Sequence, residues 1–177
     1  MKKIVVLVIV VGALIIGVMI YAALKNSTGN QVEKQSQPDV SSAATSTAQC
    51  LASDEALVTK IIDGDTIVVE GGYHVRILSI DADERGHPCY EQATTRLEEL
   101  ILNKKVRLEK DTSDVDQYKR CLRYVFLDQK NIGLGMVEEG LAIARFYEPD
   151  IKYKNEMTLV EKTAMENKAG CKWSDLP

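Results

Sequence analysis

Carboxylates and arginines stand at the ends of apolar, strand-like runs in several places along this chain. Asp63 and Asp65 flank Gly64 after one apolar run, and Arg76 lies inside the next one. That second run ends in a cluster of acids within residues 81–84. Carboxylates that converge on one point suit a hard cation, and an arginine beside them suits a phosphate group.

A third segment, residues 116–124, again places an arginine, Arg120, at the start of an apolar run. An Asp-Gly pair by itself is a common hairpin-turn signal, so the first segment alone is equally consistent with a turn. In their order and spacing, the three segments together resemble the staphylococcal nuclease (thermonuclease) family. The resemblance extends over about residues 56–173, and the apolar N-terminal segment outside it indicates a membrane-anchored or secreted member.

The resemblance implies a calcium-dependent endonuclease that hydrolyses DNA and RNA, preferably single-stranded, and leaves 3′-phosphate ends. Hydrolysis of a phosphodiester needs a nucleophilic water, an anchored phosphate and neutralisation of the charge that builds up on its oxygens. Carboxylates, a divalent ion and paired arginines supply all three. The competing interpretation is a non-catalytic binding module on the same fold, and it predicts that this set of residues is incomplete.

The resemblance also assigns roles to particular residues. It implies one group of calcium ligands: Asp65, Asp81, the backbone carbonyl of Ala82 and, through bound water, Asp63. It implies three catalytic side chains: Arg76, Glu84 and Arg120. Glu84 would orient or deprotonate the attacking water, and the arginines would hold the scissile phosphate with their planar guanidinium groups. The sequence alone is also consistent with arginines that only pair with nearby acids.

Two tyrosines, Tyr118 and Tyr147, match family positions that contact the nucleotide, although either is equally consistent with an ordinary half-buried side chain. The chain departs from the family pattern at five positions: Ala82, Asp83, Gln117, Lys119 and Arg145. The family pattern has threonine, proline, lysine, glycine and tyrosine there, respectively. These departures bear on rate and product pattern rather than on the type of reaction.

Apolar periodicity and turn residues predict an α+β domain. Strands are predicted at residues 56–62, 66–70, 73–80, 105–109 and 120–127. Helices are predicted at residues 91–103, before Gly140, and at 152–168, where Met157, Val160, Ala164 and Met165 form a core-facing stripe. Five strands with a helix between the third and the fourth predict a five-stranded OB-type β-barrel with about three helices.

The N-terminal part reads differently from the rest. Residues 4–24 carry no charge and follow Lys2 and Lys3, and a helix of that length would be ~30 Å long, enough to cross a bilayer core. We therefore predict a transmembrane anchor at 1–25, a flexible linker at 26–54 and the barrel domain at 55–177. The positive flank predicts a single-pass membrane protein with its N-terminus inside and its domain outside the cytoplasm. A cleaved signal peptide, and hence a secreted protein, is the alternative.

Four cysteines fit disulfides in an oxidising compartment, and their spacing shows no zinc pattern. Four cysteines allow three pairings, and the resembled fold suggests Cys89 with Cys171. From Asp54 onward the chain has 18 Lys and Arg residues against 24 Asp and Glu residues, a net charge of −6. This acidity argues against a tight, stable grip on nucleic acid but not against an enzyme that binds it transiently. We expect a monomer.

Overall fold

The computed structural model describes residues 48–174, which belong to one compact unit that extends over residues 46–177. The predicted anchor at 1–25 and most of the predicted linker lie outside the described residues. Within residues 48–174, no helix is both long enough and apolar enough to span a membrane.

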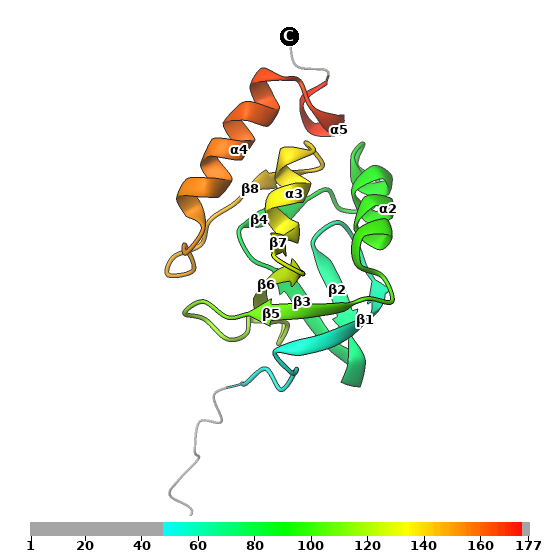
Figure 1. Cartoon of the computed structure of the whole chain (residues 1–177), viewed down its shortest axis with the longest axis vertical. Helices are drawn as coiled ribbons and strands as arrows, with labels where there is room; N and C mark the ends of the chain where they lie inside the picture. The colour runs from blue at the N-terminus through cyan, green and yellow to red at the C-terminus, as the bar shows by residue number, and fades with distance from the viewer. Residues whose placement is uncertain (1–47, 175–177) are drawn as a thin grey trace, which may run out of the picture. The chain divides into compact units, whose positions relative to one another are not determined.

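Five strands close into the predicted barrel (Figure 1). Strands β1 (Glu55–Ile61), β2 (Thr66–Val69) and β3 (Tyr73–Ile77) form an antiparallel meander, and β5 (Lys105–Glu109) pairs with the other edge of β1. Strand β6 (Cys121–Leu127) pairs with β5, and its parallel pairing with β3 closes the barrel. The prediction of a five-stranded OB-type barrel is confirmed.

The predicted third strand, 73–80, is wrong at its C-terminal end. The backbone turns at Ser79, which has a positive φ of 63°, and the amide of Leu78 donates to the carbonyl of Arg123. The chain then forms a separate strand, β4 (Ile80–Ala82), that pairs with β8 (Ala142–Ala144) in a small second sheet. Because of this break, the acids that follow leave the barrel wall.

The three predicted helices are present as α2 (Tyr90–Ile101), α3 (Ile132–Glu138) and α4 (Lys154–Glu166). The sequence did not predict three further short elements: the 3-10 helix η1 (Glu70–Gly72), strand β7 (Lys130–Asn131) and helix α5 (Gly170–Trp173).

Helix α3 contains a glycine at a position of close packing. The side chain of Asn131 caps the helix by accepting a hydrogen bond from the Leu134 amide at 3.2 Å. A Cβ atom at Gly133 would lie 3.3 Å from side-chain atoms of both Ile77 and Ile80. The glycine therefore lets α3 pack closely against the turn that separates β3 from β4.

One apolar core joins the barrel to the helices. Leu97 of α2, Met136 of α3 and Met157 of α4 are fully buried in it. Ala164 is also buried, as predicted, but Met165 is 43% exposed, so its predicted core position is wrong. Successive residues of a helix point about 100° apart, so Met165 lies at the edge of the stripe that contains Ala164 and faces solvent there.

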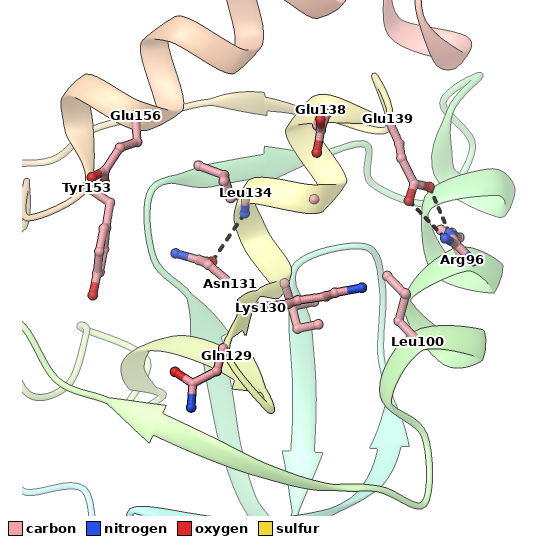
Figure 2. A pocket seen from close by; sticks show the side chains of 12 residues that line it. Arg96, Leu100, Gln129, Lys130, Asn131, Leu134, Glu138, Glu139, Tyr153 and Glu156 are labelled. Carbon is pink, nitrogen blue, oxygen red and sulfur yellow. Dashed lines mark hydrogen bonds and ion pairs between the residues drawn. The ribbon is translucent and has the colours of Figure 1, made fainter.

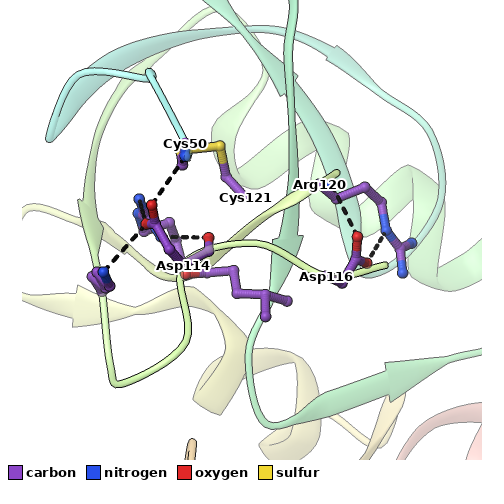
Figure 3. Close-up of a disulfide and its surroundings, with 8 residues drawn as sticks. Cys50, Asp114, Asp116, Arg120 and Cys121 are labelled. Carbon is purple, nitrogen blue, oxygen red and sulfur yellow. Dashed lines mark hydrogen bonds and ion pairs between the residues drawn. A yellow bond between two sulfur atoms is a disulfide. The ribbon is translucent and has the colours of Figure 1, made fainter. Parts of the chain in front are cut away.

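Two disulfides tie distant segments together. Cys89 is bonded to Cys171, which is the pairing that the resemblance suggested, and Cys50 is bonded to Cys121 (Figure 3). The residues of each pair lie 82 and 71 positions apart, respectively. Cys50 belongs to the segment predicted as a linker, residues 26–54. Its disulfide to Cys121 therefore attaches the end of that segment to the barrel.

We expect reduction of the two disulfides to destabilise the domain. In the chain-entropy model, bridges that close loops of this length stabilise a fold by about 4–5 kcal/mol each, and real bridges often give about 2–4 kcal/mol. Thermal melts with and without reductant should therefore show a clearly lower Tm, whereas cleavage measured well below that Tm should persist. The paired variants Cys50→Ser with Cys121→Ser, and Cys89→Ser with Cys171→Ser, separate the two contributions. An unchanged Tm in reductant would contradict the expectation.

Candidate active site

The turn between β1 and β2 carries the first pair of acids, and Gly64 allows it to pack tightly. A Cβ atom at Gly64 would lie 2.6 Å from the Cβ of Ala82 and 2.7 Å from the Cβ of Ala93. Any larger residue would push the turn away from β4 and α2. The glycine between the two acids therefore has a packing role, which brings Asp65 against the strand that carries Asp81.

Asp65, Asp81 and Arg76 come together although they lie in three different strands and turns. The Nη2 atom of Arg76 lies 3.0 Å from Oδ2 of Asp65 and 3.3 Å from Oδ1 of Asp81. The Nη1 atom of the same guanidinium donates to the carbonyls of Ile77 at 2.7 Å and Ile80 at 2.8 Å. Arg76 thus holds both carboxylates and also the turn between β3 and β4.

Asp65 is the most buried of the predicted acids, with 8% of its side chain exposed. Burial raises its pKa to about 6, and the positive charge of Arg76 only partly offsets this effect. Its Oδ2 atom accepts the Ala82 amide at 2.8 Å, and its own amide donates to Oδ1 of Asp63 at 3.0 Å. The hydrogen bonds therefore link Asp63, Asp65 and Ala82, three of the predicted metal-site residues.

The oxygen donors of this group are of the kind that calcium prefers, namely carboxylates and a backbone carbonyl. A buried carboxylate with a raised pKa is also a place where a further cation would be favourable. Within residues 48–174, however, no three acid, histidine or cysteine side chains are already arranged around one point. The donor chemistry of these described residues therefore fits calcium.

Arg120 is oriented by Asp116, as Figure 3 shows. Its Nε donates to Oδ2 of Asp116 at 2.7 Å, and its backbone amide donates to Oδ1 of the same residue at 2.9 Å. The Nη1 atom makes a long contact of 3.5 Å with Oγ1 of Thr66, which in turn donates to Asp65. Asp116 fixes one edge of the guanidinium and leaves the outer edge for a ligand.

A cleft of about 500 Å³ brings the arginines and tyrosines together. It is lined by Arg76, Arg120, Tyr118 and Tyr147, all predicted, and by Arg145. Both tyrosines are largely exposed, at 71% and 68%, so neither is an ordinary half-buried side chain. Three guanidinium groups and two open aromatic rings make this cleft suitable for phosphates and bases.

Glu84 lies exposed on the loop after β4, and its backbone carbonyl accepts the His87 amide at 3.0 Å. The neighbouring residue, Asp83, forms an ion pair with Lys172 of α5 and accepts the Cys89 amide at 2.9 Å. Burial alone would raise the pKa of Asp83, but these hydrogen bonds hold it below its usual value. Asp83, at a position where the family pattern has proline, thus ties the Glu84 loop to the C-terminal helix.

A larger cavity, about 660 Å³, lies elsewhere, and none of the predicted site residues lines it (Figure 2). In it, Arg96 is held by two hydrogen bonds to Glu139, at 2.7 and 2.9 Å, and Asn131 caps α3. The guanidinium of Arg96 therefore already has a partner in the protein. Since none of the predicted site residues lines this cavity, the cleft with Arg76 and Arg120 is the better candidate site.

Sequence reasoning missed three residues of the site. Asp116 stands four positions before Arg120, a spacing that would have been a usable signal for a local ion pair. Thr66 faces Arg76 across the β2–β3 pair, which the predicted hairpin already implied. The sequence indicated Arg145 only as a departure from the family pattern. Its Nη2 lies 3.5 Å from Oδ2 of Asp81. This contact depends on the pairing of β4 with β8, which was not predicted.

Comparison with known proteins agrees with this fold. Residues 74–175 match the family model described as staphylococcal nuclease homologue. The chain belongs to the staphylococcal nuclease family.

Among its relatives is the thermonuclease of Staphylococcus hyicus, which is 33% identical over 127 residues, covering 67% of this chain and 75% of that protein. Another is the endonuclease YncB of Bacillus subtilis (strain 168), which is 34% identical over 174 residues, covering 87% of this chain and 82% of that protein.

Proposed function

We propose that this protein is a calcium-dependent nuclease that hydrolyses phosphodiester bonds of DNA and RNA and leaves 3′-phosphate ends. One observation carries the proposal: Arg76 contacts Asp65 and Asp81 directly and shares its cleft with Arg120. Carboxylates for a cation and guanidinium groups for a phosphate therefore meet at one place. The thermonuclease and endonuclease relatives support the same reaction.

We propose the following role for each residue of the site. Asp65, Asp81 and the Ala82 carbonyl would hold calcium, with Asp63 acting through bound water, and the ion would supply positive charge next to the phosphate. Arg120 would donate to the phosphoryl oxygens from the edge that Asp116 leaves open, and Arg76 would do so from the opposite side. Glu84 would accept the proton of the attacking water.

The two exposed tyrosines favour single-stranded substrates. In a duplex, bases are stacked on each other, whereas in a single strand they are available to the rings of Tyr118 and Tyr147. Stacking accepts any base, so cleavage should show little sequence preference. We propose that the protein acts as a monomer.

The test is cleavage of single-stranded DNA and RNA by a chain covering residues 46–177, which keeps Cys50. The expected products end in a 3′-phosphate, detected as their inability to prime a polymerase until a phosphatase is added. A Glu84→Gln variant with the same melting temperature serves as the control and should be inactive. Binding of nucleic acid without cleavage would refute the enzyme and favour a binding module.

We also propose that the protein is membrane-anchored and that its barrel lies outside the cytoplasm. The uncharged stretch at residues 4–24, the preceding lysines and the pairing of all four cysteines support this location. Protease added to intact cells is expected to release the domain by cutting within residues 25–47. Protection until the membrane is broken would refute this orientation, and a domain found free in the medium would indicate a cleaved signal peptide.

A further inference from the structure

A second pocket, of about 410 Å³, adjoins the active-site cleft. Tyr118 and Arg120 line both. The second pocket is also lined by Tyr73, His74 and Lys119. We call it the flanking pocket. A nucleic-acid strand that passes over Tyr118 would run from one into the other.

The flanking pocket differs in charge from the domain that carries it. The residues from Asp54 onward have a net charge of −6, yet none of the described residues that line the pocket has a carboxylate. Lys119 supplies a positive charge, Arg120 supplies a second that is paired with Asp116, and the exposed His74 adds a further hydrogen-bonding ring. A local cationic surface on an acidic domain is suited to a phosphate.

Tyr118 supplies an aromatic surface at the boundary. The guanidinium of Arg120 lies 5.4 Å from the centre of its ring, which holds the ring next to the scissile-phosphate position. The Cys50–Cys121 disulfide also lines the pocket, so a covalent bond supports this wall (Figure 3).

Lys119 occupies a backbone conformation that favours glycine. Its φ is +64°, in the left-handed region, where residues with a Cβ atom are disfavoured. The family pattern has glycine at this position, and glycine would fit the turn without that cost. A lysine that is kept at the expense of stability points to a functional use of its charge.

We propose that the flanking pocket binds the nucleotide next to the one in the cleft, with Lys119 on its phosphate and Tyr118 against its base. The ligand is therefore a single-stranded oligonucleotide with at least one nucleotide beyond the cleaved unit. This inference rests on the proposed nuclease function and adds a subsite to it.

The test compares wild type and Lys119→Gly in the full-length protein on a dinucleotide and on substrates extended by two nucleotides on the 5′ or the 3′ side. On one of the two extended substrates, the KM of Lys119→Gly should be about 5- to 10-fold higher than that of wild type, with the same kcat. The slope of log KM against log salt should fall by about 0.7, the value for one phosphate contact on a single strand. The dinucleotide should show no change.

Thermal melting provides a second measurement. Lys119→Gly should raise the Tm, because glycine fits the positive φ, and should at the same time weaken substrate binding. A lysine with only a structural role would not give this combination. Lys168→Gly is the matched control, since Lys168 also has a positive φ, of 51°, but does not line either pocket. Its KM should match wild type on every substrate.

Wild-type KM and salt slope on both extended substrates in Lys119→Gly would overturn the proposal. An equal rise in KM on the dinucleotide would also overturn it, because Lys119 would then act in the cleft. If the wild type cleaves nothing, fluorescence anisotropy can still measure its affinity for the same oligonucleotides. This measurement tests the flanking pocket separately from the nuclease activity. Failure to cleave would refute the nuclease, whereas a loss of length-dependent affinity in Lys119→Gly would still support the flanking pocket.

Discussion

Replacement of Arg120 by alanine is expected to lower kcat by about 10²- to 10³-fold, the usual effect of losing one preorganised donor to a developing negative charge. The side chain is oriented for this role, because Asp116 binds its Nε at 2.7 Å and leaves the outer edge of the guanidinium facing the cleft. The fold should survive, since Asp116 still accepts the backbone amides of residues 118 and 120. Turnover at saturating single-stranded DNA, together with a thermal melt, measures both effects.

Two further variants sharpen this experiment. Arg120→Lys keeps the positive charge but loses the planar fork, so only a small part of the activity should return. Arg96→Ala removes a guanidinium that pairs with Glu139 away from the cleft, and its turnover should equal that of wild type. A folded Arg120→Ala protein with wild-type kcat would show that Arg120 only pairs with Asp116.

Arg76 needs a different variant, because it also stabilises the fold. Its loss would leave the buried carboxylate of Asp65 without its cation, which costs about 3–5 kcal/mol in comparable buried pairs. It would also release the carbonyls of Ile77 and Ile80. Arg76→Ala therefore confuses folding with catalysis, whereas Arg76→Lys keeps the charge beside Asp65 and tests the phosphate contact.

The barrel and its helices could be predicted because each strand and helix follows from local patterns. Alternating apolar residues and the Gly64 and Gly71-Gly72 turns indicated the first hairpins, and helical spacing indicated α2 and α4. The resemblance then supplied the closed topology, which no local pattern contains. It also placed the acids and arginines in one site, and the structure brings Asp65, Asp81, Arg76 and Arg120 to one end of the barrel.

The contacts that depend on tertiary structure could not be predicted. The sequence predicts one apolar strand through residue 80, whereas the turn at Ser79 and the hydrogen bond from the Leu78 amide to the Arg123 carbonyl end it earlier. The β4–β8 pairing, the Arg145–Asp81 contact and the bond between Cys50 and Cys121 join segments far apart in the chain. Apolar periodicity within one segment carries no information on such pairings.

Removal of calcium is the other change with a large expected effect: excess chelator should abolish cleavage, and added calcium should restore it. An exposed oxygen site with few protein ligands belongs at the weak end of calcium affinity, so the half-maximal concentration should be about 10⁻⁴–10⁻³ M. Magnesium should restore little activity, because the smaller ion requires stricter octahedral geometry and releases its water reluctantly.

Two variants identify the ligands that this dependence requires. Asp81→Asn should raise the calcium concentration needed for half-maximal cleavage, and Asp65→Asn should do the same while also removing a buried partner of Arg76. Calcium should raise the Tm of the wild type through ligand binding to the folded state, and this shift should shrink in Asp81→Asn. The rise in Tm gives a readout that does not depend on cleavage. Full activity in excess chelator would refute calcium binding by these carboxylates. An unchanged calcium concentration for half-maximal cleavage in both variants would refute it as well. The arginines would then stabilise the phosphate without calcium.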